Sequence, residues 1–191
     1  MSSTRQKSLT LFILIINLFL INAGAELKVD SKNSFLSWEA SKKVGSKHNG
    51  SIALKSSKIF MKNGKLSGGE FEINMDSITV NELAPDWEKK FIGHMKSADF
   101  FEVNKYRTAK LILDKKISPL KFSGKLTIKN KTKPIEVQFS KNNLTYTGEI
   151  SFDRTNFGII YGAGNYFKSL TMDKIINNEV VVKFKILLKK K

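Results

Sequence analysis

The chain has 191 residues and carries 33 Lys and Arg against 17 Asp and Glu, which gives a formal net charge of +16. It has no cysteine, so disulfides, thiolate nucleophiles and cysteine-ligated metal sites are excluded. The hydrophobic content of 41%, with 14 Phe, is too high for a disordered polycation, and the length suits one domain or two small ones. The composition therefore predicts a folded, basic protein.

The N-terminal segment has the pattern of an export signal. Arg5 and Lys7 precede an apolar run over residues 9–21, and the small residues Ala23 and Ala25 follow it. This order of basic, apolar and small residues is typical of a cleavable signal peptide. A membrane anchor is the less favoured interpretation, because the run is shorter than the about 20 residues that a bilayer-spanning helix needs.

We therefore expect residues 1–25 to be removed near Ala25 and residues 26–191 to act in the periplasm or as a secreted protein. The charge then falls from +16 to +14, because the removed segment holds two basic residues and no acidic one. The remaining charge is almost all lysine and lacks an Arg-rich patch, so no nucleic-acid partner is expected. Weak contact with anionic membrane surfaces is the expected effect of this charge.

From Leu36 onward the dominant pattern is alternation of apolar and polar residues with period two. Such a strand has one apolar and one solvated face, which is typical of antiparallel sheets. The weaker segments contain Leu36, Trp38, Ala40, Ile52, Leu54, Leu111 and Leu113. The stronger segments contain Phe71, Ile73, Met75, Phe122, Leu126, Ile128, Ile135, Val137, Phe139, Leu144, Tyr146, Ile150, Phe152, Val180, Val182, Phe184, Ile186 and Leu188.

One helix interrupts the strands between residues 81 and 101. Pro85 suits a first helical turn, and the acidic residues that follow it favour the positive end of the helix. Trp87, Phe91, Met95 and Ala98 recur at helical spacing and predict one apolar stripe. We expect this helix to cover a sheet or to cap the mouth of a barrel.

About eight strands remain, separated by turn clusters and without a Pro- or Gly-rich linker, which predicts a single mainly β domain. A two-sheet sandwich and a closed barrel both fit, and an eight-stranded barrel can be filled or can hold one small ligand. Gly50, Gly124 and Gly148 fall in the inward phase, where they either leave open space or bend the strands. A membrane-spanning barrel is disfavoured, since only 180–188 is long enough.

The residues that could carry chemistry are few. His48 and His94 lack metal-site spacing, and no nucleophile elbow, phosphate loop or dinucleotide motif is present. Asp153 and Arg154 are adjacent and suggest a structural charge cluster at the end of a strand. We predict no catalytic site, no metal and no cofactor.

Several of these segments together resemble the YceI-like family of exported lipid-binding proteins. They occur in family order and span residues 28–188. Arg107 replaces a usual Pro, Leu111 a usual Phe and Phe157 a common Trp, and these changes alter the bulk around any cavity. The matching segments are 48–50 (HNG), 94–101 (HMKSADFF), 102–109 (EVNKYRTA), 124–128 (GKLTI), 132–134 (TKP) and 153–159 (DRTNFGI).

The resemblance implies an eight-stranded antiparallel, lipocalin-like barrel with one helix capping an end. It further implies a hollow interior that holds a long apolar lipid, such as a polyprenyl chain or an isoprenoid quinone. His94, Asp153 and Arg154 are candidate polar anchors for a head group or for the helix. From strand phase and helix stripe, the predicted lipid-binding residues are Trp38, Phe71, Ile73, Met75, Phe91, Met95, Phe100, Phe101, Phe122, Leu126, Phe139, Tyr146, Ile150, Phe152 and Phe184.

The sequence therefore predicts a non-enzymatic binding or carrier protein, monomeric or homodimeric, with the lipid as its ligand. A second hypothesis is a filled barrel that acts as an interaction module through its basic, membrane- or protein-binding surface. An enzyme that acts on a lipid, with His94 essential for turnover, is the third.

Overall fold

The structure is a computed structural model that describes residues 27–190. The expected signal peptide, residues 1–25, lies outside the described residues and stays a prediction. Within 27–190, no helix is both long enough and apolar enough to cross a bilayer.

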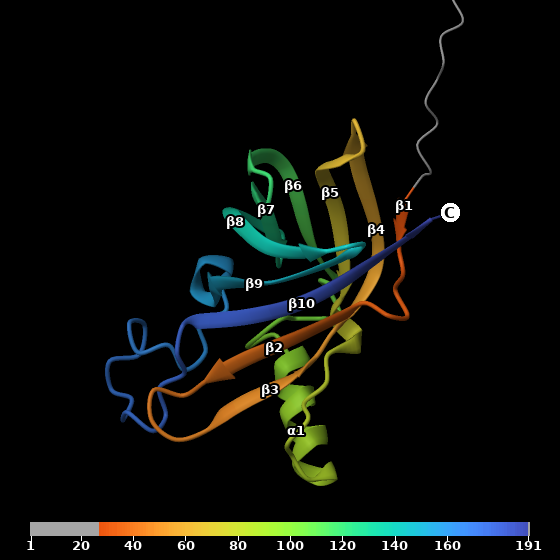
Figure 1. Cartoon of the computed structure of the whole chain (residues 1–191). Helices are drawn as coiled ribbons and strands as arrows, with labels where there is room; N and C mark the ends of the chain where they lie inside the picture. Colours follow the sequence, from red (N-terminus) through yellow and green to blue (C-terminus); the bar gives the residue numbers. More distant parts are fainter. Residues whose placement is uncertain (1–26, 191) are drawn as a thin grey trace, which may run out of the picture.

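The alternating segments form β-strands, and the chain is mainly β, as predicted (Figure 1). Each strand runs antiparallel to its neighbours. The strands are β1 (Leu27–Val29), β2 (Phe35–Ser41), β3 (Lys47–Ser51), β4 (Ala53–Lys62), β5 (Lys65–Asn74), β6 (Thr108–Ser118), β7 (Lys121–Ile128), β8 (Lys131–Asn142), β9 (Thr145–Asp153) and β10 (Glu179–Lys190).

The strands make one strongly curled sheet in the order β3-β2-β10-β9-β8-β7-β6-β5-β4, with β1 paired to the end of β10. The two outermost strands of this order, β3 and β4, are separated in the sequence only by Ile52. The Ile52 N–H donates to the Leu36 carbonyl (3.1 Å). The two edges of the sheet therefore meet at Ile52, and the sheet wraps around an interior.

The predicted count of about eight strands is wrong, because residues 27–190 form ten. The predicted alternation began at Leu36 and therefore missed β1, and it did not separate β3 from β4. The turn at 30–34 separates β1 from β2, and Ile52 separates β3, which pairs with β2, from β4, which pairs with β5. The antiparallel, barrel-like architecture itself is confirmed.

The predicted helix is α1 (Pro85–Lys96), with Pro85 in its first turn. Its apolar stripe is only partly buried: Met95 is buried and Phe91 half-buried, whereas the Trp87 side chain is 65% exposed. The first half of α1 extends past the sheet (Figure 1), so Trp87 has no sheet face to pack against. The predicted apolar stripe is therefore wrong at Trp87, because this part of α1 has no sheet beside it.

The two ends of the curled sheet are built differently. At one end lie the short turns β4–β5, β6–β7 and β8–β9, and we call this the hairpin end. At the other lie the β2–β3 turn, the connection 75–107 with η1 (Met75–Ser77) and α1, and the connection 154–178 with η2 (Arg154–Phe157). We call this the loop end.

Candidate functional site

The interior of the sheet holds a cavity of about 200 Å³ whose wall exposes only apolar atoms. Every long strand contributes to this wall, because the inward phase of the alternation is apolar throughout. On β10, for example, Val182, Phe184 and Ile186 face the cavity, while Lys183 and Lys185 face outward. The predicted residues that line the cavity are Trp38, Phe71, Ile73, Met75, Met95, Phe100, Phe101, Leu126, Phe139, Tyr146, Ile150, Phe152 and Phe184.

Two predicted residues lie behind this wall instead of in it. Phe122 is fully buried and stacks against Phe139 at 5.9 Å between ring centroids. Phe91 of α1 packs on Trp38 (6.4 Å) and His48 (4.7 Å). Phe122 therefore borders the wall without lining it, and Phe91 packs at the loop end against residues of β2 and β3.

The sequence reasoning missed several lining residues. Ile59 and Leu66 lie near the β4–β5 turn, where a bulge between Phe60 and Met61 disturbs the alternation. Ile78, Ile159 and Ile176 come from irregular connections, which carry no periodic signal. Of these five residues, only Ile59 and Leu66 could have been found from the sequence, through the spacing of apolar residues toward the β4–β5 turn.

The inward glycines do not open the cavity. A β-carbon on Gly50 would lie 1.8 Å from the Thr79 carbonyl oxygen, and one on Gly124 would lie 1.9 Å from that of Ile112. These glycines instead allow neighbouring backbone to approach closely. The hypothesis that these glycines leave open space is therefore wrong. The cavity exists because side chains from opposite sides of the curled sheet do not reach one another.

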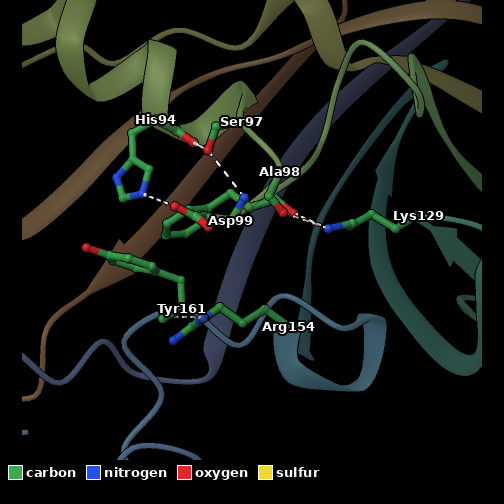
Figure 2. Close-up of polar contacts among 8 residues, drawn as sticks. His94, Ser97, Ala98, Asp99, Lys129, Arg154 and Tyr161 are labelled. Atoms are coloured by element: carbon green, nitrogen blue, oxygen red, sulfur yellow. Dashed lines mark hydrogen bonds and ion pairs between the residues drawn. The ribbon is translucent and has the colours of Figure 1, made fainter.

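Residues from α1 and the segment after it close the loop end of the cavity. Met95, Phe100 and Phe101 all reach the cavity wall. The Lys129 ammonium donates to the carbonyls of Phe100 (2.8 Å) and Ala98 (3.3 Å), and Figure 2 shows its approach to Ala98. The β7–β8 turn thus holds this closing segment in place.

Among residues 27–190, Arg154 is the one charged residue in the cavity wall, and it is 3% exposed. Its guanidinium donates to the carbonyls of Ile159 (2.8 Å), Tyr161 (2.9 Å), Ile176 (3.1 Å) and Asn177 (3.0 Å). Burial lowers the pKa of the guanidinium, and the Asp153 charge opposes that effect. Because its guanidinium nitrogens all donate to backbone carbonyls, Arg154 joins the two ends of the connection 159–177.

The other two candidate anchors are also occupied by local contacts. Asp153 accepts from the Thr155 N–H and hydroxyl (both 2.7 Å) and so caps η2. The His94 ring lies 3.5 Å from the Asp99 carboxylate and packs edge-on against Tyr161 (4.6 Å between centroids), as Figure 2 shows. Neither side chain belongs to the cavity wall. Their role as head-group anchors stays a prediction, and the contacts favour the alternative of holding the helix and η2.

The three departures from the family pattern have different placements. Leu111 lines the cavity, so the smaller side chain there directly widens it. Phe157 is buried and packs edge-on against Phe152. Arg107 is exposed, and its guanidinium pairs with Asp76 (3.0 Å) outside the cavity.

No group of three or more His, Asp or Glu side chains in residues 27–190 is placed to hold a metal ion. His48 pairs with Glu82 (2.7 Å), and neither residue belongs to the cavity wall. The site that these residues offer is therefore the apolar cavity.

The sequence matches a family model described as the YceI-like domain over residues 27–188. No curated protein matches the chain. Solved structures do match. BcnA from Burkholderia cenocepacia is 21% identical, with a TM-score of 0.64 over 85% of this chain and 100% of that one.

Two further solved structures have the same fold. A polyisoprenoid-binding domain from Saccharophagus degradans, described as implicated in plant cell wall breakdown, is 16% identical, with a TM-score of 0.63 over 88% of this chain and 100% of that one. The YceI protein of Campylobacter jejuni is 14% identical, with a TM-score of 0.51 over 73% of this chain and 85% of that one. At these identities the likeness shows the fold alone.

Proposed function

This chain belongs to the YceI-like family, and on that premise we propose that it is a binding or carrier protein for a long apolar lipid of the isoprenoid type. The hydrocarbon chain lies in the cavity, and the polar head group lies outside the wall. We further propose that the protein acts after export, in the periplasm or outside the cell.

The observation that carries this proposal is the size and chemistry of the cavity. At about 200 Å³ it exceeds an engineered cavity of about 150 Å³ that stays dry and binds an apolar ligand. Because its wall exposes only apolar atoms, water gains no hydrogen bonds inside. Each buried methylene group of a ligand contributes about 0.8 kcal/mol, and ordering the flexible chain offsets part of this.

The comparisons support a binding protein rather than an enzyme. The domain from Saccharophagus degradans is named for polyisoprenoid binding, and its fold covers most of this chain. An isoprenoid chain suits a wall of branched aliphatic and aromatic side chains, because its methyl branches fill the gaps between them.

The alternative of a filled barrel loses its basis, since the aromatic side chains leave the cavity open. Phe122 and Phe157, the largest fully buried side chains, do not line the cavity. The alternative of a lipid-processing enzyme gains no support from His94, which lies outside the cavity wall.

Native mass spectrometry of protein purified from a lipid-containing host tests the proposal. We expect a mass increase that organic extraction removes and that added isoprenoid alcohol restores. Protein that carries no lipid and takes up no isoprenoid would contradict the proposal.

A variant that fills the cavity gives a sharper test. Ala109 lines the cavity on β6, and Ala109→Phe places a ring in the space that the lipid needs. We expect lipid uptake to fall at least about tenfold, because several methylene contacts are lost. Leu111→Met, which conserves volume in the adjacent lining position, is the matched control and should keep uptake within about twofold.

A further inference from the structure

The connection between η2 and β10 exposes an unusual number of large apolar side chains. Tyr161, Tyr166, Phe167 and Met172 are 43–53% exposed, and all four lie within one stretch of chain. Single exposed apolar residues are common, but a contiguous group marks a site of interaction. This stretch has no helix or strand of its own. Tyr161, at its start, packs one edge against His94 and Phe100, whereas Tyr166, Phe167 and Met172 lie farther along the stretch.

The β2–β3 turn belongs to the same surface. The Lys43 N–H donates to the Ile175 carbonyl (2.8 Å), and Lys42 bridges to Ile176. Val44 at the tip of this turn is 55% exposed. Figure 1 shows the turn and the connection side by side at the loop end. We call residues 42–46 and 161–174 together the loop face.

The loop face is cationic as well as apolar. Lys42, Lys43, Lys168 and Lys174 belong to it, and none of them forms an ion pair within the described part of the chain. Its single acidic residue is Asp173, whose pKa is lowered by a hydrogen bond from Thr171 and by the charges of Lys174 and Lys42. Exposed tyrosine, phenylalanine and lysine in one patch match the interface of a bilayer, where rings enter the head-group layer and ammonium groups meet anionic lipids.

The loop face also adjoins the wall of the cavity. Ile159 and Ile176, just outside its longer segment, line the cavity wall. Arg154 binds the backbone at both ends of that segment, through the carbonyls of Ile159, Tyr161 and Ile176 among others. The base of the loop is therefore fixed against the cavity while its apolar tip points away from the sheet, as Figure 1 shows.

From these observations we propose that the loop face docks on the surface of an anionic phospholipid bilayer and brings the loop end of the cavity to the membrane. Docking itself needs only the loop face, whereas lipid exchange at the docked end rests on the proposed function. A second copy of the chain is the poorer occupant, because two identical lysine-bearing faces repel each other.

The hairpin end provides a matched control surface. Phe60, Ile117 and Leu120 are exposed there, and Lys115 and Lys116 lie beside them. These residues lie at two separate hairpins, β4–β5 and β6–β7, and include no tyrosine. Nonspecific binding of a basic protein to membranes would involve both ends equally, whereas specific docking involves only the loop face.

Vesicle flotation tests the proposal. Wild-type protein is mixed with vesicles of phosphatidylcholine alone or with equal parts of phosphatidylglycerol, and we expect binding to the mixed vesicles only. Tyr166→Ser combined with Phe167→Ser should weaken this binding at least about tenfold, since two inserted rings are removed. Lys168→Gln combined with Lys174→Gln should weaken it to a similar degree and reduce its dependence on salt.

The control variant Ile117→Ser with Leu120→Ser should keep vesicle binding within about twofold of wild type, because the hairpin end makes no bilayer contact in this mode of docking. Equal losses from the two ends would overturn the proposal, as would a wild-type protein that ignores phosphatidylglycerol. Sedimentation equilibrium tests whether the loop face binds a second copy of the chain instead. Loop-face variants that dissociate a dimer but leave vesicle binding unchanged would also overturn the docking proposal.

A separate readout keeps the two proposals distinguishable. The chain has two tryptophans, and Trp87→Phe leaves Trp38 in the cavity wall as the only one. Farnesol added without vesicles should change Trp38 fluorescence equally in the loop-face variants and in their parent. Vesicle binding without a farnesol response would contradict the lipid-carrier function while supporting docking, and the reverse result would overturn docking alone.

Discussion

At the hairpin end the strands are joined by short turns whose residues are exposed, whereas at the loop end long connections fold back over the sheet. Asn63 and Gly64 illustrate the first case: both have positive φ, and a β-carbon on Gly64 would meet nothing within 4 Å. Gly50 illustrates the second, because the connection 75–107 places the Thr79 carbonyl where its β-carbon would be. The hairpin end therefore sets only strand pairing, while the loop end also closes the cavity.

This difference has a consequence for stability and for function. Residues at the loop end satisfy buried backbone groups and complete the cavity wall, so they have large effects on folding. The same end carries the exposed loop face. The connection 154–178 therefore has a base that is held by hydrogen bonds and a tip that is accessible to solvent. The four predictions below test this contrast, beginning with the largest expected effect.

Replacing Arg154 should have the largest effect. Arg154→Met removes the donor to four backbone carbonyls, and we expect the free energy of unfolding to fall by about 4 kcal/mol. Urea denaturation measures this. Arg107→Met is the matched control, because the Arg107 guanidinium is exposed and pairs only with Asp76, so its loss should be below about 1 kcal/mol. Equal losses for the two arginines would show that Arg154 does not hold the loop end together.

A pair of glycine substitutions compares the ends directly. Gly50→Ala forces the Thr79 carbonyl away from β3 and should cost about 3 kcal/mol. Gly64→Ala meets no atom and should cost about 1 kcal/mol, the strain of a left-handed alanine. Thermal unfolding of both variants measures the difference. If Gly64→Ala were the more damaging change, the loop end would not be the tightly packed one.

His94 should have a moderate effect that is confined to stability. His94→Ala removes ring contacts to Phe100 (5.1 Å) and Tyr161 (4.6 Å), which should lower the free energy of unfolding by about 1 kcal/mol. Because His94 is not in the cavity wall, isoprenoid binding should stay within about twofold of wild type. A selective loss of binding, with stability intact, would instead identify His94 as a head-group anchor.

The outer surface of the sheet gives the smallest effect and serves as a reference for both ends. Hydrogen bonds from Lys183 and then Lys47 lower the pKa of Glu39 to about 2 from its ordinary 4.5. Glu39→Gln should therefore cost less than about 1 kcal/mol at neutral pH, as exposed ion pairs do. Since the folded protein lowers this pKa, the stabilisation is complete above pH 4.5 and is lost as the pH falls toward 2.

Urea denaturation at several pH values measures this difference between Glu39→Gln and wild type. Glu149→Gln on β9 is the control for a substitution on the outer face, because Glu149 forms no ion pair among residues 27–190. A difference that persisted at pH 2 would mean that the glutamate acts through packing and not through its charge.

Much of the candidate site follows from local pattern. The period-two alternation assigns Phe71, Ile73 and Phe184 to the inner face, and all three line the cavity. Pro85 likewise fixes the start of α1. The irregular connections were beyond such reasoning: nothing periodic marks Ile159 as part of the wall, because its position depends on the Arg154 hydrogen bond to its carbonyl.

The sequence by itself determined the antiparallel β architecture and the inner face of most strands, because strand geometry ties side-chain direction to residue number. Only the tertiary structure decided that the interior is hollow, that Gly124 admits backbone instead of ligand and that Arg154 is fully engaged by carbonyls. These outcomes depend on distances between segments far apart in the chain, and such distances follow from how the sheet curls and not from any local pattern.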